Sequence, residues 1–382
     1  MNLAIQEYIE PFLKSNESLC ISLYQPTHKT HPENEQDVIR YKNLLKILDK
    51  SLREHYSGRE AQKILAPFYA LIDDEEFWNH NQQGLAILAT HKHFKIIKLP
   101  HTVKELAVVA DSFHIKPLIR MLQLNERYQI LGLNLHEAKL FEGTRDTIEE
   151  ILIAPEVPHT LTDALGEELT EPHLTVSSYG KGTQGPPMFH GQGGRKDQID
   201  LDAERFFRKV DEGILEYHSR HSKLPLILAS LPEYHHLFHR ISHNPYLVAE
   251  SIKYHPDDLS LDELRKEAWK IIKPVLQTKL EELIDKFAEL RTKKMGSDKI
   301  EEIAKAALAG RVETLFIDAD KHIPGEVDHQ TGEVKQDNML DPEIDDLLDD
   351  LGEMVLKTQG HVLVIPSDKM PTENGIAAIY RY

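Results

Sequence analysis

The spacing of apolar and polar positions predicts a mixed series of helices and strands in the first third of the chain. Helical spacing predicts helices over 3–14, 35–56 and 58–72. Short apolar or alternating runs predict strands at 19–24, "GLAILAT" and "FKIIKLP". "ELAVVADSFHIKPLIRML" predicts a strand and then a helix that begins near Pro117, a residue suited to a first helical turn. We therefore expect a mixed α/β domain over 1–125.

A second domain is expected over 126–274. "RYQILGLNLHEAKLFEG" predicts a β-hairpin that turns from Asn134 to Glu137. A helix is predicted from about Asp200 to Arg220, with Phe206 and Phe207 as core side chains. "LPLILAS" predicts a buried strand, and "LDELRKEAWKIIKPVL" predicts a closing helix. Between these elements, 155–200 is rich in Gly, Pro, Ser, Thr and His without a period, which predicts a long functional or disordered loop.

The third domain is expected over 275–382. It begins with the predicted helix "VLQTKLEELIDKFAELRTKK". "KIEEIAKAALAGRVETLFIDAD" predicts a helix that stops at Gly310 and a following apolar strand, and "HVLVIP" and "GIAAIYRY" predict further strands. Helices that alternate with apolar strands indicate a layered α/β sandwich. The predicted fold class is therefore α/β, with three domains.

Composition narrows the class of protein. The formal net charge of −18 argues against a protein that coats nucleic acid through clustered bases. No run of apolar residues is long enough for a membrane span, and the start lacks a secretory signal, so we expect a cytoplasmic protein that does not enter a membrane. The single cysteine, Cys20, is interpreted as a core thiol. The acidic stretch 337–354 is interpreted as a solvated helix face or as a docking site for a basic partner.

The segment 186–214 changes from a glycine-rich loop into an amphipathic helix. Glycines permit positive φ and close approach to another backbone, so main-chain N–H groups become available as hydrogen-bond donors. Arg195 and Lys196 are suited to grip phosphate groups, Arg as a planar fork and Lys as a point charge. The alternatives are a plain turn, or a loop that binds the phosphate of a small ligand.

Several fragments, in this order, resemble the eukaryotic and archaeal class-one peptide release factors, their Pelota relatives and, most closely, the related bacterial proteins. The fragments are "CISLYQPTHK", "GLAILATH", "LAVVADSFHIKPLIRML", "YQILGLNLHEAKLFEG", "FHGQGGRKD", "RFFRKVDEGI", "LPLILASLPEYHHLF", "AALAGRVETLFI" and "GIAAIYRY". The resemblance implies a release-factor-like N-terminal domain, a middle RNase H-like sandwich with a long mobile loop, and a C-terminal α/β sandwich like that of the release factors.

In that family, the loop tip reads His-Gly-Arg-Gly-Gly-Gln and promotes hydrolysis of peptidyl-tRNA in the ribosome. Here the same window reads His190-Gly191-Gln192-Gly193-Gly194-Arg195, so Arg and Gln have exchanged places. The resemblance implies a possible peptidyl-tRNA hydrolase with catalytic residues Gln192, Gly193, Gly194 and Arg195. The implied RNA-binding residues are His190, Gly191, Lys196 and Gln198.

The implied partners are a ribosome or tRNA, with a translational GTPase or another protein bound through the C-terminal domain; no cofactor is expected. Stop-codon decoding is not expected. The family's Tyr-x-Cys-x-x-x-Phe window reads Ala107, Val109 and Phe113 here, and there is no Asn-Ile-Lys-Ser stretch. Codon-independent rescue or a stress role fits better.

Two other readings stay open beside that hydrolase. One is a catalytically inactive ribosome-binding module. The other is a metal-dependent nuclease, for which the middle domain offers the carboxylates Glu142, Asp146 and Asp163. Zinc binding by a histidine group in "EYHHLFHRISHNPY" is weighed against an ordinary amphipathic turn, and no metal site is predicted; the group comprises His235, His236, His239 and His243.

Overall fold

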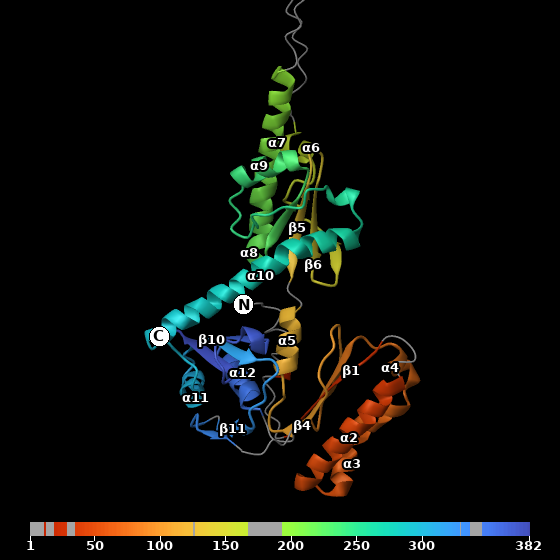
Figure 1. Ribbon diagram of the computed structural model, residues 1–382. Coiled ribbons are helices and arrows are strands. Elements are labelled where there is room, and N and C mark those ends of the chain that lie inside the picture. Colours follow the sequence, from red (N-terminus) through yellow and green to blue (C-terminus); the bar gives the residue numbers. More distant parts are fainter. Residues whose placement is uncertain are drawn as a thin grey trace, which may run out of the picture. The chain divides into compact units, whose positions relative to one another are not determined.

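The computed structural model describes residues 11–12, 19–28, 35–124, 127–166, 193–328, 330–336 and 346–382. The chain divides into two compact units, one of Met1–Leu124 with Glu281–Tyr382 and the other of Asn125–Leu280 (Figure 1). Each of the three predicted domains contributes a four-stranded sheet with helices, which confirms the α/β fold class. The exact domain boundaries near 125 and 274 stay predictions.

The N-terminal part of the first unit is an antiparallel sheet in the order β3-β2-β1-β4. Strand β1, one of the two central strands, is buried on both faces. Apolar side chains of α2 and α3 pack on one face of the sheet, and a second apolar cluster covers the other face. Cys20 is only 1% exposed, which confirms the core thiol. The elements are β1 (Cys20–Pro26), α2 (Glu35–His55), α3 (Gly58–Ala70), η1 (Leu71–Asp73), α4 (Glu75–Asn79), β2 (Gly84–Ala89), β3 (Phe94–Leu99), β4 (Leu106–Ala110) and α5 (Lys116–Leu124).

The C-terminal part of the first unit is a sheet in the order β13-β10-β14-β9. As predicted, helix α11 stops before Gly310, which takes a φ of 65° that favours glycine, and a buried strand follows. The elements are β9 (Gly296–Ser297), α11 (Ile300–Leu308), β10 (Val312–Asp318), β11 (Gly325–Val327), β12 (Val334–Gln336), α12 (Leu347–Lys357), β13 (His361–Ile365), η5 (Ser367–Lys369) and β14 (Ile376–Tyr380).

Strand β13 is an edge strand, and the side chain of Gln123 from α5 bonds to its backbone. The Gln123 amide Nε2 donates to the Val362 carbonyl at 2.6 Å, and its Oε1 accepts from the Val364 N–H at 2.9 Å. The side chain therefore uses one donor and one acceptor of the strand, as a neighbouring strand would.

The acidic helix α12 is buried, which corrects the predicted solvated face over the part of 337–354 that the structure describes. Asp349 is 1% exposed and accepts from the N–H of Ile115 at 3.1 Å and of Lys116 at 2.5 Å. Asp346 forms an ion pair with the Lys116 ammonium. These carboxylates accept hydrogen bonds from the N–H groups at the start of α5 and pair with one buried cation. The basic partner expected for the acidic stretch is therefore part of the same chain.

The second unit is built on a sheet in the order β7-β6-β5-β8, in which β5 and β6 form the predicted hairpin and β8 runs parallel to β5. One apolar cluster includes side chains of α6, α7 and α9, and another includes those of α10. The elements are β5 (Tyr128–Leu133), β6 (Ala138–Gly143), β7 (Ile148–Ile151), α6 (Leu161–Leu165), α7 (Gly193–Ile214), η3 (Leu215–Ser219), α8 (Arg220–Ser222), β8 (Leu226–Ala229), α9 (Pro232–Ile241), η4 (Pro256–Asp258) and α10 (Leu261–Thr292).

Two predictions about the helices of this region were wrong. The segment 155–200, expected to be a loop, contains α6, which begins with a capping box between Thr160 and Asp163. The last residues of the same segment, from Gly193 on, belong to α7. The two helices expected on either side of 274 are one helix of 32 residues, α10, with Pro274 inside it. A proline removes one main-chain hydrogen bond, but the turns on both sides keep the apolar spacing, so the helix continues through it.

Candidate functional site

The candidate site is the N-terminal end of α7. His190, Gly191 and Gln192 lie outside the described residues. Gly193 is the first residue of the helix, so Gly194, Arg195, Lys196 and Gln198 lie in its first two turns. The helix therefore begins well before the predicted start near Asp200. Arg, Lys and Gln are good helix formers, and the helix extends through them as far as the glycine pair.

The start of α7 has the electrostatic character of an anion site. The first N–H groups of a helix have no partner within it, and the aligned peptide dipoles place partial positive charge there. The first turn contains no acidic residue, and the sequence puts Arg195 and Lys196 in it. Two cations at the positive end of a helix oppose its dipole, and a bound anion would offset their charge.

The following turns of α7 anchor the helix firmly in the second unit. Phe206 and Phe207 are 0% exposed, which confirms them as core residues. Lys209 Nζ donates to the Ala164 carbonyl at 2.6 Å, so the helix is tied to α6. Asp211 accepts from Ser242 Oγ at 2.6 Å. The base of α7 is therefore held on several sides, and its first turns extend from a fixed support.

The histidines near α9 form structural hydrogen bonds. His235 Nε2 lies 2.8 Å from the Ser230 carbonyl oxygen, and His239 Nε2 lies 2.8 Å from Ser251 Oγ. Burial, and then the charge of His235, lower the pKa of His239. Helix α9 ends at Ile241, so His243 is not on the helical face that a shared zinc site would need. The geometry favours the ordinary amphipathic element.

Two of the three carboxylates considered for a nuclease have separate structural roles. Glu142 forms an ion pair with Arg127. Asp163 accepts from the N–H of Thr160 at 3.0 Å and caps α6. None of them belongs to the group of metal-spaced side chains found in the described part of the chain, so the nuclease hypothesis loses its proposed metal ligands.

Residues 127–311 match the family model described as bacterial archaeo-eukaryotic release factor family 3. This part of the chain is therefore similar to the bacterial archaeo-eukaryotic release factors. The matched segment contains the whole of α7, including its glycine pair. No curated protein matches the chain.

The chain is also similar to solved structures of release factors and Pelota proteins. A ribosome-bound archaeal Pelota, described together with ABCE1, is 10% identical over 99% of this chain and 94% of that one, with a TM-score of 0.40. S. cerevisiae Dom34, a translation termination-like factor described as interacting with Hbs1, is 13% identical over 78% and 74%, with a TM-score of 0.36. The archaeal termination factor aRF1 is 14% identical over 99% and 97%, with a TM-score of 0.24.

Two of the three side chains in the window compared with the stop-codon pattern are buried, and Val109 is half-buried. Ala107 and Phe113 are 7% and 6% exposed. The Phe113 ring packs edge-to-face on Phe12, with 5.6 Å between the ring centroids. The one residue that agrees with the decoding pattern is therefore a core residue. No helix in the described ranges is long and apolar enough to cross a membrane.

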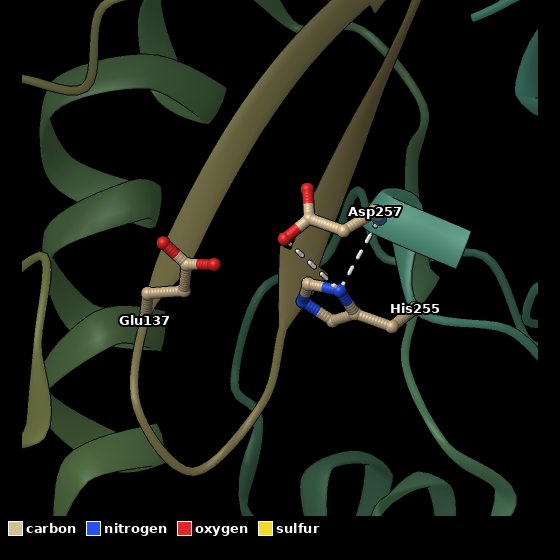
Figure 2. A group of neighbouring side chains, drawn as sticks. All are labelled: Glu137, His255 and Asp257. Carbon is tan, nitrogen blue, oxygen red and sulfur yellow. Dashed lines mark hydrogen bonds and ion pairs between the residues drawn. The ribbon is translucent and has the colours of Figure 1, made fainter. Parts of the chain in front are cut away.

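One group of polar side chains in the second unit was missed by sequence reasoning. Glu137, at the start of β6, approaches His255 and Asp257, at η4, and together they have metal-ligand spacing (Figure 2). The spacing of His255 and Asp257 is visible in the sequence, but nothing in the sequence joins them to Glu137. The packing of the η4 segment on the β5–β6 hairpin brings the three together.

Proposed function

We propose that this protein is a release-factor-like translation factor that binds a ribosome or tRNA, and that it acts in codon-independent rescue or stress. The match of the segment containing α7 to the release factor family is the observation that carries this proposal. The start of α7 supports it, because free N–H groups and two cations suit the phosphates of a tRNA acceptor end.

The proposed chemistry is hydrolysis of the peptidyl-tRNA ester. Water attacks the ester carbonyl, and the oxygen that develops negative charge needs donors that are already in place. The main-chain N–H groups of Gly193, Gly194 and Arg195 are proposed as these donors, each worth about 3–4 kcal/mol when well aimed. Gln192 is proposed to orient the water. Contact with RNA is assigned to His190, Gly191, Lys196 and Gln198.

A second candidate is a ribosome-binding module without catalysis. Arg195 stands where the family has the catalytic glutamine, and this exchange favours binding over hydrolysis. In both cases, binding of a translational GTPase or another protein through the C-terminal segment is part of the proposal. The two candidates differ only in turnover, so one set of assays separates them.

The test uses the full chain on stalled ribosomes that carry peptidyl-tRNA. Turnover that Gly194→Ala abolishes supports hydrolysis, since a side chain at 194 hinders close approach of the backbone. Gly58→Ala, in α3 of the first unit, is the matched control and keeps full turnover. Cosedimentation without turnover supports the binding module. Cosedimentation that is indifferent to deletion of 178–199 contradicts the role given to this segment in docking.

A further inference from the structure

The strongest site outside the α7 end is the group formed by Glu137, His255 and Asp257. One ligand atom of each residue lies within 4.8 Å of the ligand atoms of the other two. Figure 2 shows the Asp257 carboxylate beside the His255 ring, with the Glu137 carboxylate facing them from the hairpin. The group combines one imidazole with two carboxylates, a donor set that divalent transition metals accept.

The two backbone segments that carry this group are tightly packed against each other. A Cβ atom on Gly132 would lie 2.5 Å from Pro256 Cγ, so only glycine in β5 lets the η4 segment sit this close. Asn134 braces the hairpin side, because its Oδ1 accepts from the N–H of Glu137 at 2.8 Å. Its Nδ2 donates to His255 Nε2 across 2.9 Å and thereby holds the ring. On the other side of the ring, His255 Nδ1 accepts from the Asp257 N–H at 3.2 Å and lies 3.5 Å from Asp257 Oδ2.

One lysine side chain lies beside both carboxylates. Lys139 Nζ lies 2.6 Å from Asp257 Oδ1 and 3.3 Å from Glu137 Oε1. The Lys139 side chain is 24% exposed and has a flexible stem, so its ammonium can leave the carboxylates without disturbing the core.

We propose that Glu137, His255 and Asp257 bind one divalent transition-metal ion, such as Zn²⁺, and that Lys139 is its built-in competitor. Metal–ligand bonds of about 2.0–2.2 Å require the three ligand atoms to close in slightly around the ion. The ion and the ammonium cannot share the same two carboxylates. Removal of the ammonium therefore strengthens binding of the metal. This site is independent of the function proposed for the α7 end.

The experiment measures the affinity of the full chain for Zn²⁺ by competition with a chromophoric chelator. Asp257→Asn removes a ligand and is expected to weaken binding about tenfold or more, whereas Lys139→Met is expected to tighten it by a similar factor. The control variant His236→Ala/His239→Ala removes histidines of α9 and leaves this affinity unchanged. Thermal unfolding confirms that each variant is folded.

The opposite responses of the two variants separate a metal site from a structural ion pair. A structural pair loses stability in both variants and gains no affinity for zinc in either. Equal zinc affinity in the wild-type chain and Asp257→Asn would overturn the proposal. It is also overturned if neither the wild-type chain nor Lys139→Met takes up one zinc ion per chain, or if the α9 variant loses the site.

Discussion

The ammonium of Lys116 forms an ion pair with the carboxylate of Asp346, a side chain with no solvent exposure that lies 230 residues further along the chain. Burial alone would raise the pKa of Asp346, but the hydrogen bond with His322 and the charge of Lys116 together lower it. The pair joins the start of α5 to the start of α12, and both of its side chains are buried.

Lys116→Met is expected to lower the free energy of unfolding by about 3–5 kcal/mol, because it leaves a buried carboxylate without its cation. Denaturant unfolding at neutral pH measures the change. Lys104→Met is the matched control: it breaks an exposed pair with Asp320 and should cost about 0–1 kcal/mol. Equal losses in the two variants would contradict the buried role of Lys116.

His114 makes the stability of the first unit depend on pH. Burial is the main cause that lowers its pKa to about 3, and Asp346, Lys116 and His322 face it, with Asp349 Oδ1 at 3.9 Å from its Nδ1. An unfolded histidine titrates near pH 6.5, so between about pH 6.5 and 3 the unfolded chain binds the extra proton. The stability due to neutral His114 is thus complete above pH 6.5 and is lost as the pH falls toward 3.

His114→Asn removes this titration. Its expected effect is to reduce the fall in unfolding free energy between pH 6.5 and 4 by up to about 1.4 kcal/mol per pH unit. Unfolding curves of the wild-type chain and of His114→Asn at several pH values measure how the unfolding free energy depends on pH. The lowered pKa of Asp346 contributes to this dependence in both proteins. Identical slopes would show that His114 is not the responsible group.

The sequence predicted elements well where apolar spacing decides the structure. The strands around Cys20 and Leu228, the hairpin at Asn134 and the stop at Gly310 follow from local pattern and turn chemistry. The start of α7 and the unbroken α10 were missed, because a glycine pair and Pro274 are read as breaks. The burial of Asp349 was missed because its partners lie on α5, more than 230 residues away in the chain.

Gly132→Ala tests the close contact below the proposed metal site. The added methyl group would meet Pro256 at 2.5 Å, and overpacking of this kind is expected to cost about 1–3 kcal/mol. Zinc affinity should fall as well, since η4 must shift. Gly58→Ala, whose new methyl group would meet only the flexible end of Arg53, serves as the control and leaves stability nearly unchanged. Unfolding curves and the chelator assay measure both effects.

Pro274→Ala is expected to stabilise α10. Proline inside a helix costs about 3 kcal/mol, since it removes a hydrogen bond and crowds the preceding turn. The side chain of Pro274 is exposed, so its removal leaves no cavity. A rise in the free energy of unfolding of about 1–3 kcal/mol is predicted. A fall would contradict this expected cost of the proline.

Arg195→Ala/Lys196→Ala is expected to weaken binding to ribosomes and to reduce its dependence on salt. Each phosphate contact that is lost lowers the slope of log affinity against log salt by about 0.7–0.9. Cosedimentation over a range of salt concentrations measures the slope. Lys42→Ala/Lys46→Ala removes the same charge from exposed positions on α2 and should leave the slope unchanged. Equal slopes in all variants would show that Arg195 and Lys196 do not contact phosphates in the complex with the ribosome.

The amide of Gln123 has a consequence for how copies of this protein meet one another. An exposed strand with free N–H and C=O groups invites the same strand of another molecule to add itself, and growth of this kind leads to fibrils. By engaging Val362 and Val364, a single side chain closes part of that border within its own molecule. Another molecule therefore finds fewer free backbone groups along β13, because α5, about 240 residues earlier in the chain, already occupies two of them.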